Sequence, residues 1–258
     1  MSREIDEVKY EVAQATRILS SLGLAAGVTA SLGHVSMRVP NQPDRFVVKG
    51  RGYQIDALEE MQYYDMIVCD LEGYKTDGPA KSTQCSEVKI HSCIYRERPD
   101  VMSVVHVHPR YTVLMTVLEE RLRPMAQEGA QLVKSELPVY PHTKTVWSEE
   151  EGAELVTYLG DGKAVLMRGH GAAMTGKTVE DSVLSMLQLE EKARMNYWAL
   201  VAKGSDHKYL SDVLVDESTN RPQQSEYPHF KELMRRIGGN PPRDGTWNSY
   251  QKKVSGDM

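Results

Sequence analysis

The sequence has few cysteines and no long apolar run, and each absence excludes a class of protein. Its three cysteines, Cys69, Cys85 and Cys93, form no CxxC pair, so we interpret them as thiols in a reducing cytoplasm and not as a disulfide framework. No apolar stretch approaches the roughly 18 residues that a membrane span needs. The first residues, MSREIDEVKYEVAQ, are charged and lack the apolar core of a secretion signal. We therefore expect a cytoplasmic protein that does not enter a membrane.

The sequence also lacks a basic run, an internal repeat and a low-complexity linker. Acidic residues number 36 and basic residues 31, for a formal charge of -5, so binding of nucleic acid through its phosphates is not expected. Apolar residues make up 40% of 258 residues, which is enough for a substantial core. We expect one domain over residues 1–258, in which the polar residues 205–258 form a peripheral extension.

Hydrophobic periodicity and capping residues predict helices that alternate with short strands. Ser86 is the expected N-cap of the second helix, and Ser148 begins a capping box. Gly23, Gly160 and Gly204 are expected helix stops. The expected helices cover residues 4–22, 86–96, 111–118, 149–159 and 178–203, and the expected strands cover 34–38, 46–49, 66–70, 101–107 and 163–167. This alternation favours an α/β fold.

Two histidines near the end of an apolar strand carry the strongest chemical signal. His106 and His108 are two residues apart, so on a strand their side chains point to the same face. Neutral imidazoles that converge are good ligands for Zn, Mn, Fe or Co. The alternative is a pair of core histidines, each with its own hydrogen-bond partner. On this segment alone, we favour a divalent metal.

A third histidine and a glutamate complete the candidate metal site. His170 lies between Gly169 and Gly171, and glycines permit an unusual backbone and a close approach to a metal or substrate. Three protein ligands leave one position open, as in catalytic metal sites. Glu87, near the start of a predicted helix, is a candidate fourth ligand or general base, although a helix-capping role is also open. His91, one turn later, is a weaker candidate ligand.

These segments, in this order, resemble the class II aldolase/adducin family. The resemblance rests on Gly33-x-Val-Ser-x-Arg38, Ser86-Glu87, His106-x-His108-Pro109 and Gly169-His170-Gly171, and it covers residues 5 to 203. It implies a three-layer α/β/α fold with a central, mainly antiparallel sheet. It also implies a homotetramer with active sites at subunit interfaces.

The same resemblance implies one divalent metal ion per subunit, held by His106, His108 and His170. Glu87 matches the family glutamate, which ligates the metal or handles protons. The implied reaction is cleavage of a carbon–carbon bond, in which the metal stabilises the enolate that is left behind. Tyr140 falls roughly where the family places a proton-donating tyrosine from a neighbouring subunit. A packed tyrosine with a satisfied hydroxyl is an equal alternative.

The expected substrate pocket departs from that of the sugar-phosphate aldolases in this family. Those enzymes carry Gly-Asn-x-Ser where this chain has Gly33-His34-Val35-Ser36, and Ser-Ser-Glu where it has Cys85-Ser86-Glu87. Small residues of their next loop are replaced here by Lys49-Gly50-Arg51. Fewer small hydroxyl donors weaken a phosphate site, whereas cationic side chains suit a planar carboxylate. We list as substrate-binding candidates His34, Ser36, Lys49, Gly50, Arg51 and Ser86.

These departures favour the decarboxylase branch of the family. Its members act on hydroxylated aromatic or heteroaromatic carboxylates and related ring-cleavage acids, so we expect a small-molecule substrate of this class. Lys49 and Arg51 can also be read as solvated loop charges. Two other functions stay open: an aldolase or epimerase of a sugar phosphate or small hydroxy-carbonyl compound, and a noncatalytic adducin-like interaction module.

Overall fold

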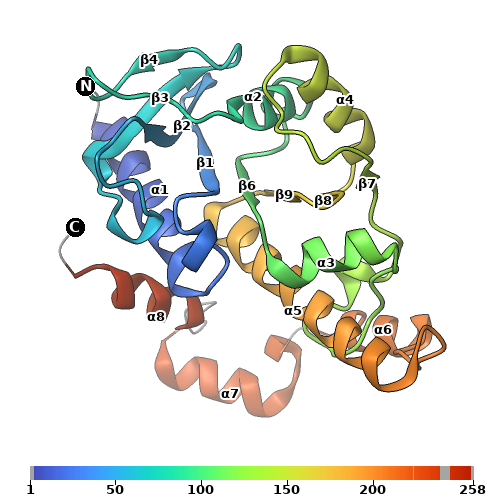
Figure 1. The fold of residues 1–258 in the computed structure, drawn as a ribbon. Coiled ribbons are helices and arrows are strands. Elements are labelled where there is room, and N and C mark those ends of the chain that lie inside the picture. Colours follow the sequence, from blue (N-terminus) through green and yellow to red (C-terminus); the bar gives the residue numbers. More distant parts are fainter. Residues whose placement is uncertain (1–2, 223, 239–244, 257–258) are drawn as a thin grey trace.

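A twisted sheet forms the middle of the fold and carries helices on both faces (Figure 1). The computed structural model describes residues 3–222, 224–238 and 245–256. Within them the main path of the sheet runs β4-β3-β2-β1-β6-β9-β8-β7, and β5 pairs with β2. All neighbours are antiparallel except β7 and β8. The strands are β1 (His34–Val39), β2 (Gln42–Arg51), β3 (Met66–Asp70), β4 (Lys75–Asp77), β5 (Thr83–Gln84), β6 (Ser103–Val107), β7 (Val139–Tyr140), β8 (Ala164–Met167) and β9 (Gly171–Gly176).

The helices divide into two layers. Helices α1 and α5 pack against one face of the sheet, and α2 and α4 pack together on the other face (Figure 1). Helix α3 lies against α5. The expected α/β/α architecture with a mainly antiparallel sheet is therefore confirmed. The helices are α1 (Arg3–Ser21), α2 (Val88–Glu97), α3 (Arg110–Leu118), α4 (Glu149–Leu159), α5 (Val179–Lys203), α6 (Asp212–Thr219), α7 (Pro228–Ile237) and α8 (Gly245–Val254).

The pleat of β1 and β6 decides which side chains reach the α2 layer. His34 pairs with His106 and Ser36 pairs with Val104 across the two antiparallel strands. Val104 belongs to the core beneath α2 and α4, whereas Val105 belongs to the core beneath α1 and α5. Because alternate residues of a strand point to opposite faces, His34, Ser36 and His106 all lie on the α2 side of the sheet.

Most helix ends follow the predicted capping residues. Ser148 Oγ accepts from the Glu151 backbone N–H in a capping box, and Gly160 and Gly204 end α4 and α5. The expected N-cap at Ser86 is wrong: α2 begins at Val88, and its N-cap residue Glu87 makes no side-chain cap hydrogen bond. Ser86 Oγ instead accepts a hydrogen bond from Arg51.

Glu190 of α5 holds the start of α3 in place. Its carboxylate accepts from the backbone N–H groups of Tyr111 and Thr112, each at 2.9 Å, and from Thr112 Oγ1 at 2.8 Å. A carboxylate at a helix N-terminus satisfies donors that have no partner within the helix. Since α3 directly follows His108-Pro109, this contact also fixes the chain beyond the histidine pair.

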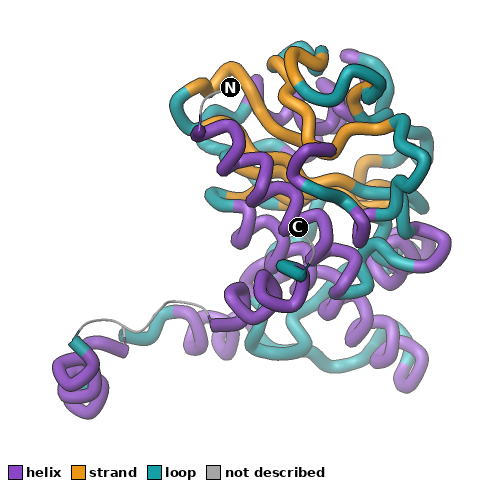
Figure 2. Tube along the Cα trace, turned by 90° about the vertical axis from the view of Figure 1, so that its left-hand side faces the viewer, coloured by secondary structure: helices purple, strands orange, loops and turns teal. Residues whose placement is uncertain are grey.

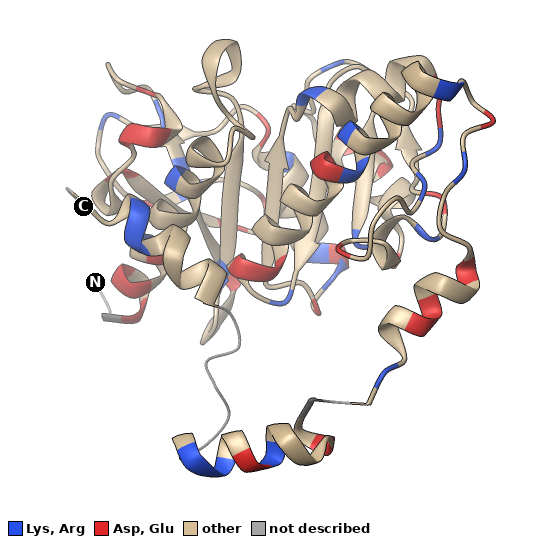
Figure 3. Ribbon diagram, turned by 90° about the horizontal axis from the view of Figure 1, so that it is seen from below, with Lys and Arg blue, Asp and Glu red and all other residues tan. Residues whose placement is uncertain are grey.

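The C-terminal residues add helices at the edge of the molecule. Helix α8 packs on α1 through the buried Trp247, whereas α7 stands away from the body (Figure 2). In Figure 3, Lys and Arg are interspersed with Asp and Glu, and α7 carries both. In the part of the chain that the structure describes, no helix is long and apolar enough to cross a bilayer. The single domain with its extension at 205–258 stays a prediction, and residues 1–2, 223, 239–244 and 257–258 of that assignment lie outside the described residues.

Candidate metal centre and adjoining cavity

Four side chains from three separate segments converge on one point. Glu87 precedes α2, His106 is the penultimate residue of β6 with His108 just beyond the strand, and His170 lies in the turn between β8 and β9. One donor atom of each lies within 4.8 Å of the others. His106 Nε2 is 3.2 Å from both His108 Nε2 and a Glu87 oxygen, and His170 Nε2 is 3.5 Å from the other Glu87 oxygen. The structure thus brings together all four predicted metal ligands.

The chemistry of these donors fits a divalent cation. His106 Nδ1 is 3.0 Å from the Ala172 carbonyl, which only accepts, so in neutral His106 the proton lies on Nδ1 and the lone pair on Nε2. That lone pair faces the Glu87 carboxylate, so two hydrogen-bond acceptors point towards each other. A cation bound between them would give both a partner. A carbonyl that fixes the far nitrogen of a ligand histidine is a common support of metal sites.

Burial and mutual contacts set the charges of the cluster. Burial raises the pKa of Glu87, but positive charge on His106 when it is protonated, together with hydrogen bonds from His106 and His170, outweighs burial and holds the pKa well below the usual range. A cation bound in place of those protons would act in the same direction, so this residue is a carboxylate at neutral pH. Burial, together with His106 and His170, lowers the pKa of His108 to about 3, so its imidazole is neutral. A carboxylate and neutral imidazoles are the protonation states that metal ligation requires.

Two glycines allow His170 to reach the other ligands. Gly169 has φ +62°, in the left-handed region that glycine adopts at little cost. A Cβ on Gly171 would lie 2.4 Å from the Val107 carbonyl oxygen and 3.2 Å from a ring carbon of both His106 and His108. The expected unusual backbone occurs at Gly169, and Gly171 lies close to the Val107 carbonyl and the two histidine rings, while the expected close approach to a metal or substrate stays a prediction.

A cavity of about 390 Å³ lies against these donors. His34, Lys49, Gly50, Arg51 and Ser86, all predicted to bind substrate, line it. It is also lined by Glu87, His108 and His170, so the donor cluster forms part of its wall, with the buried His106 behind them. The cavity therefore brings metal donors and cationic side chains to the same space.

The two cations of the cavity wall differ in their partners. Lys49 is buried, and its Nζ lies 2.6 Å from Asp56 Oδ1, so its charge is balanced inside the protein. Arg51 is exposed and donates to Ser86 Oγ through one guanidinium nitrogen. Its other N–H groups have no partner among the described residues, which leaves Arg51 as the cation able to form a bidentate contact with a carboxylate.

Two predicted site residues do not reach the cavity. Ser36 is fully buried and contacts His91 and Tyr95, so its expected role in direct substrate binding is wrong. It faces α2 from the middle of β1, beneath the cavity wall. Tyr140 is also buried, and its hydroxyl donates to Glu154 at 3.1 Å. The structure places it inside its own chain, as the packed alternative expected.

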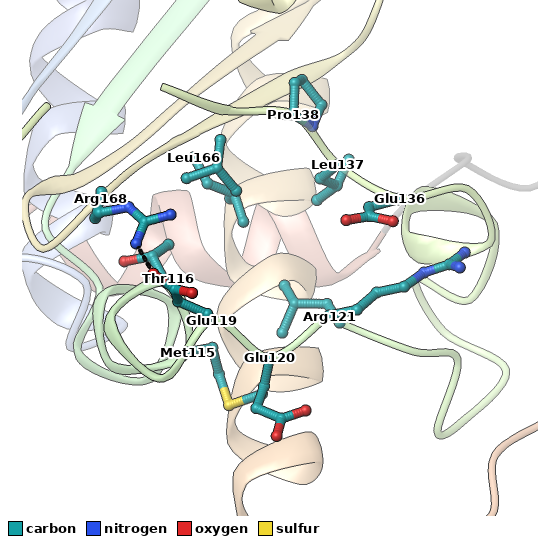
Figure 4. Close-up of a pocket in the computed structure, with 12 residues that line it drawn as sticks. Met115, Thr116, Glu119, Glu120, Arg121, Glu136, Leu137, Pro138, Leu166 and Arg168 are labelled. Carbon is teal, nitrogen blue, oxygen red and sulfur yellow. Dashed lines mark hydrogen bonds and ion pairs between the residues drawn. The ribbon is translucent and has the colours of Figure 1, made fainter. Parts of the chain in front are cut away.

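A second cavity, of about 460 Å³, lies between α3 and the end of β8 that leads towards the His170 turn, and none of the four converging donors lines it (Figure 4). Its walls come from the end of α3, residues 136–139 and β8. Arg168 and Glu119 form an ion pair there, and its polar side chains include none of the four converging donors. This cavity offers neither an imidazole nor a thiol.

Comparison with known proteins assigns the family. A model of the class II aldolase and adducin N-terminal domain matches residues 10–197. The chain belongs to this family. The 3,4-dihydroxyphthalate decarboxylase of Arthrobacter keyseri is 30% identical over 205 residues, which cover 75% of this chain and 79% of that protein.

Solved structures of the class II aldolase family share the fold. An aldolase II superfamily protein from Pseudomonas syringae has a TM-score of 0.78 at 20% identity and covers 99% of this chain and 96% of its own. An L-fuculose 1-phosphate aldolase from Glaciozyma antarctica has a TM-score of 0.71 at 21% identity, with 91% of each chain covered. The relatives include decarboxylases and adducins, and the similarity to the decarboxylases supports a lyase.

Sequence reasoning missed several residues of this site. Asp56, Thr145 and Trp147 line the cavity from loops that carry no motif. Asp56 follows Lys49 by seven residues, a spacing that no regular element brings into contact, so only the fold reveals the ion pair. His91, the weaker candidate ligand, forms hydrogen bonds with His34 and Ser36 and lies apart from the four donors.

Proposed function

We propose that this chain is a metal-dependent carboxy-lyase that decarboxylates a hydroxylated aromatic or heteroaromatic carboxylate, with a dicarboxylate as the favoured substrate. The observation that carries the proposal is the single cavity that joins Glu87, His108 and His170 to the exposed guanidinium of Arg51. The similarity to 3,4-dihydroxyphthalate decarboxylases supports the choice of reaction. One divalent ion per subunit, Zn, Mn, Fe or Co, would be held by these three donors together with His106.

A bound divalent ion supplies Lewis acidity, which stabilises the negative charge left on the substrate when carbon dioxide departs. The remaining work falls to the chain itself. Arg51 would hold the second carboxylate of the substrate through paired N–H donors, with the Ser86 hydroxyl beside it. The backbone of Gly50 and the side chain of Lys49 would complete this wall, and His34 would face the substrate from β1.

Glu87 is the residue of the cavity suited to move a proton. It is a carboxylate at neutral pH, and one of its oxygens already accepts from the Val146 backbone N–H at 3.1 Å. We assign to Glu87 the transfer of a proton from the substrate hydroxyl towards the carbon that loses the carboxylate. Tyr140 has no part in this scheme within its own subunit because its hydroxyl is bound to Glu154.

The quaternary structure and location are further parts of the proposal. Family resemblance supports a homotetramer with interfacial active sites, and Trp147, which is 69% exposed beside the cavity, is a side chain that a neighbouring subunit would cover. Light scattering on the purified protein measures the assembly. If a monomer is fully active, the active site does not require a subunit interface, and this part of the proposal fails. The free thiols Cys69, Cys85 and Cys93 support a reducing cytoplasm.

The decisive experiment couples metal analysis to a substrate screen. Protein purified with Zn, Mn, Fe or Co is expected to retain about one ion per chain and to release carbon dioxide from 3,4-dihydroxyphthalate, and chelation should abolish both. Aldehyde release from ketose phosphates alone would assign the chain to the aldolases or epimerases. Absence of both metal binding and turnover would instead favour a noncatalytic adducin-like module.

A further inference from the structure

A buried chain of hydrogen bonds leads from α2 to the wall of the cavity. The Tyr95 hydroxyl lies 2.7 Å from Ser36 Oγ, Ser36 Oγ lies 2.6 Å from His91 Nδ1, and His91 Nε2 lies 2.7 Å from His34 Nδ1. All four side chains are buried. His34 is the one member of this chain that lines the cavity, and its Nε2 has no partner among the described residues.

The bond lengths indicate the direction in which the protons point. If Tyr95 donates to Ser36, Ser36 to His91 and His91 to His34, each short bond holds one hydrogen, and the last imidazole hydrogen lies on His34 Nε2. In the reverse direction, His91 Nδ1 donates to Ser36. The two hydroxyl groups of Ser36 and Tyr95 then share one bond, so one of their two hydrogens needs another acceptor. The acceptor available to it is the Val104 carbonyl, 3.5 Å from Ser36 Oγ, which is longer than an ordinary O–H···O bond.

We infer that Tyr95, Ser36 and His91 fix His34 as a neutral hydrogen-bond donor whose Nε2–H faces the cavity and binds an anionic oxygen of the substrate. His91 is then a positioning residue, because it acts on the ligand only through His34. A neutral, oriented donor costs no reorganisation when the ligand arrives. The nature of the ligand rests on the proposed function, whereas the proton positions do not.

The geometry of the contact between the two rings supports a neutral His34. If His91 Nε2 donates to His34 Nδ1, that His34 nitrogen accepts and carries no hydrogen, so the ring holds its one hydrogen on Nε2. Burial lowers the pKa of His91 to about 3, so its ring is neutral at pH 7.

The same cluster is poorly arranged for a second metal ion. His34, Cys85 and His91 offer three donor atoms within 4.8 Å. However, the two nitrogens are 2.7 Å apart, which is a hydrogen bond, whereas two nitrogens on a tetrahedral zinc at about 2.0 Å each lie roughly 3.3 Å apart. The hydrogen-bonded chain is therefore the better description.

Nuclear magnetic resonance of the protein labelled with ¹⁵N-histidine tests the proton positions without any turnover. Long-range proton–nitrogen correlations distinguish the two tautomers, and the signals are assigned with His34→Gln and His91→Gln. We expect hydrogen on Nε2 of both His34 and His91, and a mixed population in Tyr95→Phe, which removes the hydrogen that sets the direction. Hydrogen on His34 Nδ1 in the wild-type protein would overturn the inference.

Ligand binding and kinetics test the role of His91. Phthalate, a dianion that lacks hydroxyl groups, should shift the His34 Nε2–H signal of the wild-type protein but not that of His91→Phe. With 3,4-dihydroxyphthalate, His91→Phe should raise KM about tenfold, the usual worth of a hydrogen bond to a charged group, and change kcat less. His91→Gln keeps an N–H near Nε2 and should recover part of the loss.

The matched control is Ser182→Ala, which removes a buried hydroxyl pair with Ser103, 2.8 Å apart, outside this chain of hydrogen bonds. It should lower stability and leave KM unchanged. If Ser182→Ala and His91→Phe raise KM alike, His91 has only a structural role and the inference fails. If the wild-type protein releases no carbon dioxide but the phthalate response follows His91, the proposed function fails and the inference stands.

Discussion

Replacing Gly171 by alanine tests whether the turn at His170 shapes the metal centre. The added Cβ would lie 2.4 Å from the Val107 carbonyl oxygen, about 1 Å closer than an ordinary contact. It would also press on the rings of His106 and His108, each 3.2 Å away. Overpacking of this kind costs about 1–3 kcal/mol of folding free energy. Since metal ligands tolerate shifts of only about 0.2 Å, we also expect metal affinity to fall at least ~tenfold.

The control for this variant is Gly176→Ala at the other end of β9. There a Cβ would lie 2.6 Å from the Ser182 backbone nitrogen, an equally tight contact far along the strand from the ligands. Urea unfolding of the metal-free proteins should show both variants destabilised, while chelator competition should show weakened metal binding in Gly171→Ala alone. Equal metal affinity in the two variants would refute the reasoning that Gly171 admits the histidine rings.

Three further predictions concern other parts of the molecule. His106→Ala should lose bound metal, measured by elemental analysis, and with it all carbon dioxide release; full retention of both would remove His106 from the centre. Arg51→Lys should raise KM for a dicarboxylate about tenfold, because a bidentate contact becomes a single one, with little effect on a monocarboxylate. Glu190→Gln should cost about 1–2 kcal/mol in urea unfolding, since the amide replaces one of the two acceptor oxygens with an NH2 group that faces donors at the start of α3.

A fourth prediction concerns pH. The hydrogen bond from Lys9 lowers the pKa of Asp77, so this carboxylate stabilises the fold above its unfolded pKa near 4 and loses that contribution as the pH falls through its lower folded value. The pair is partly exposed, so the effect should stay below about 1 kcal/mol. Asp77→Asn should therefore be less stable than the wild type at pH 7, by a difference that is smaller at pH 3, as measured by urea unfolding. An equal difference at both values would contradict this assignment.

The metal donors could be predicted from the sequence because each lies in a local pattern that carries geometry. His106 and His108 lie two residues apart on and just beyond a strand, and the glycines around His170 mark a tight approach. Local periodicity predicted the alternation of helices and strands, whereas the three layers and the mainly antiparallel sheet were expected from the family resemblance. The order of the strands could not be predicted, because antiparallel pairing between distant segments leaves no trace in a single sequence.

The errors arose where a motif residue serves the fold and not the ligand. Ser36 shares the face of β1 that carries His34, and the motif therefore predicts that both line the substrate pocket. Ser36 lies two residues further along the strand, where His91 and Tyr95 of α2 cover it and keep it from the cavity. Arg38 of the same motif donates to the Tyr95 and Arg98 carbonyls near the end of α2. The residue type of Ser86 predicts a helix cap, whereas Arg51, far along the chain, donates to its hydroxyl. Such tertiary partners decide a polar residue's role.

The wide separation of the four donors along the chain has a consequence for how the protein matures. Glu87, the His106–His108 pair and His170 meet only after β6 has paired with β9 and α2 has settled on the sheet. An unfolded polypeptide cannot offer this set, so an ion that binds it acts as a reversible cross-link and shifts the folding equilibrium by mass action. The melting temperature of the protein should then rise with the concentration of free divalent ion around it.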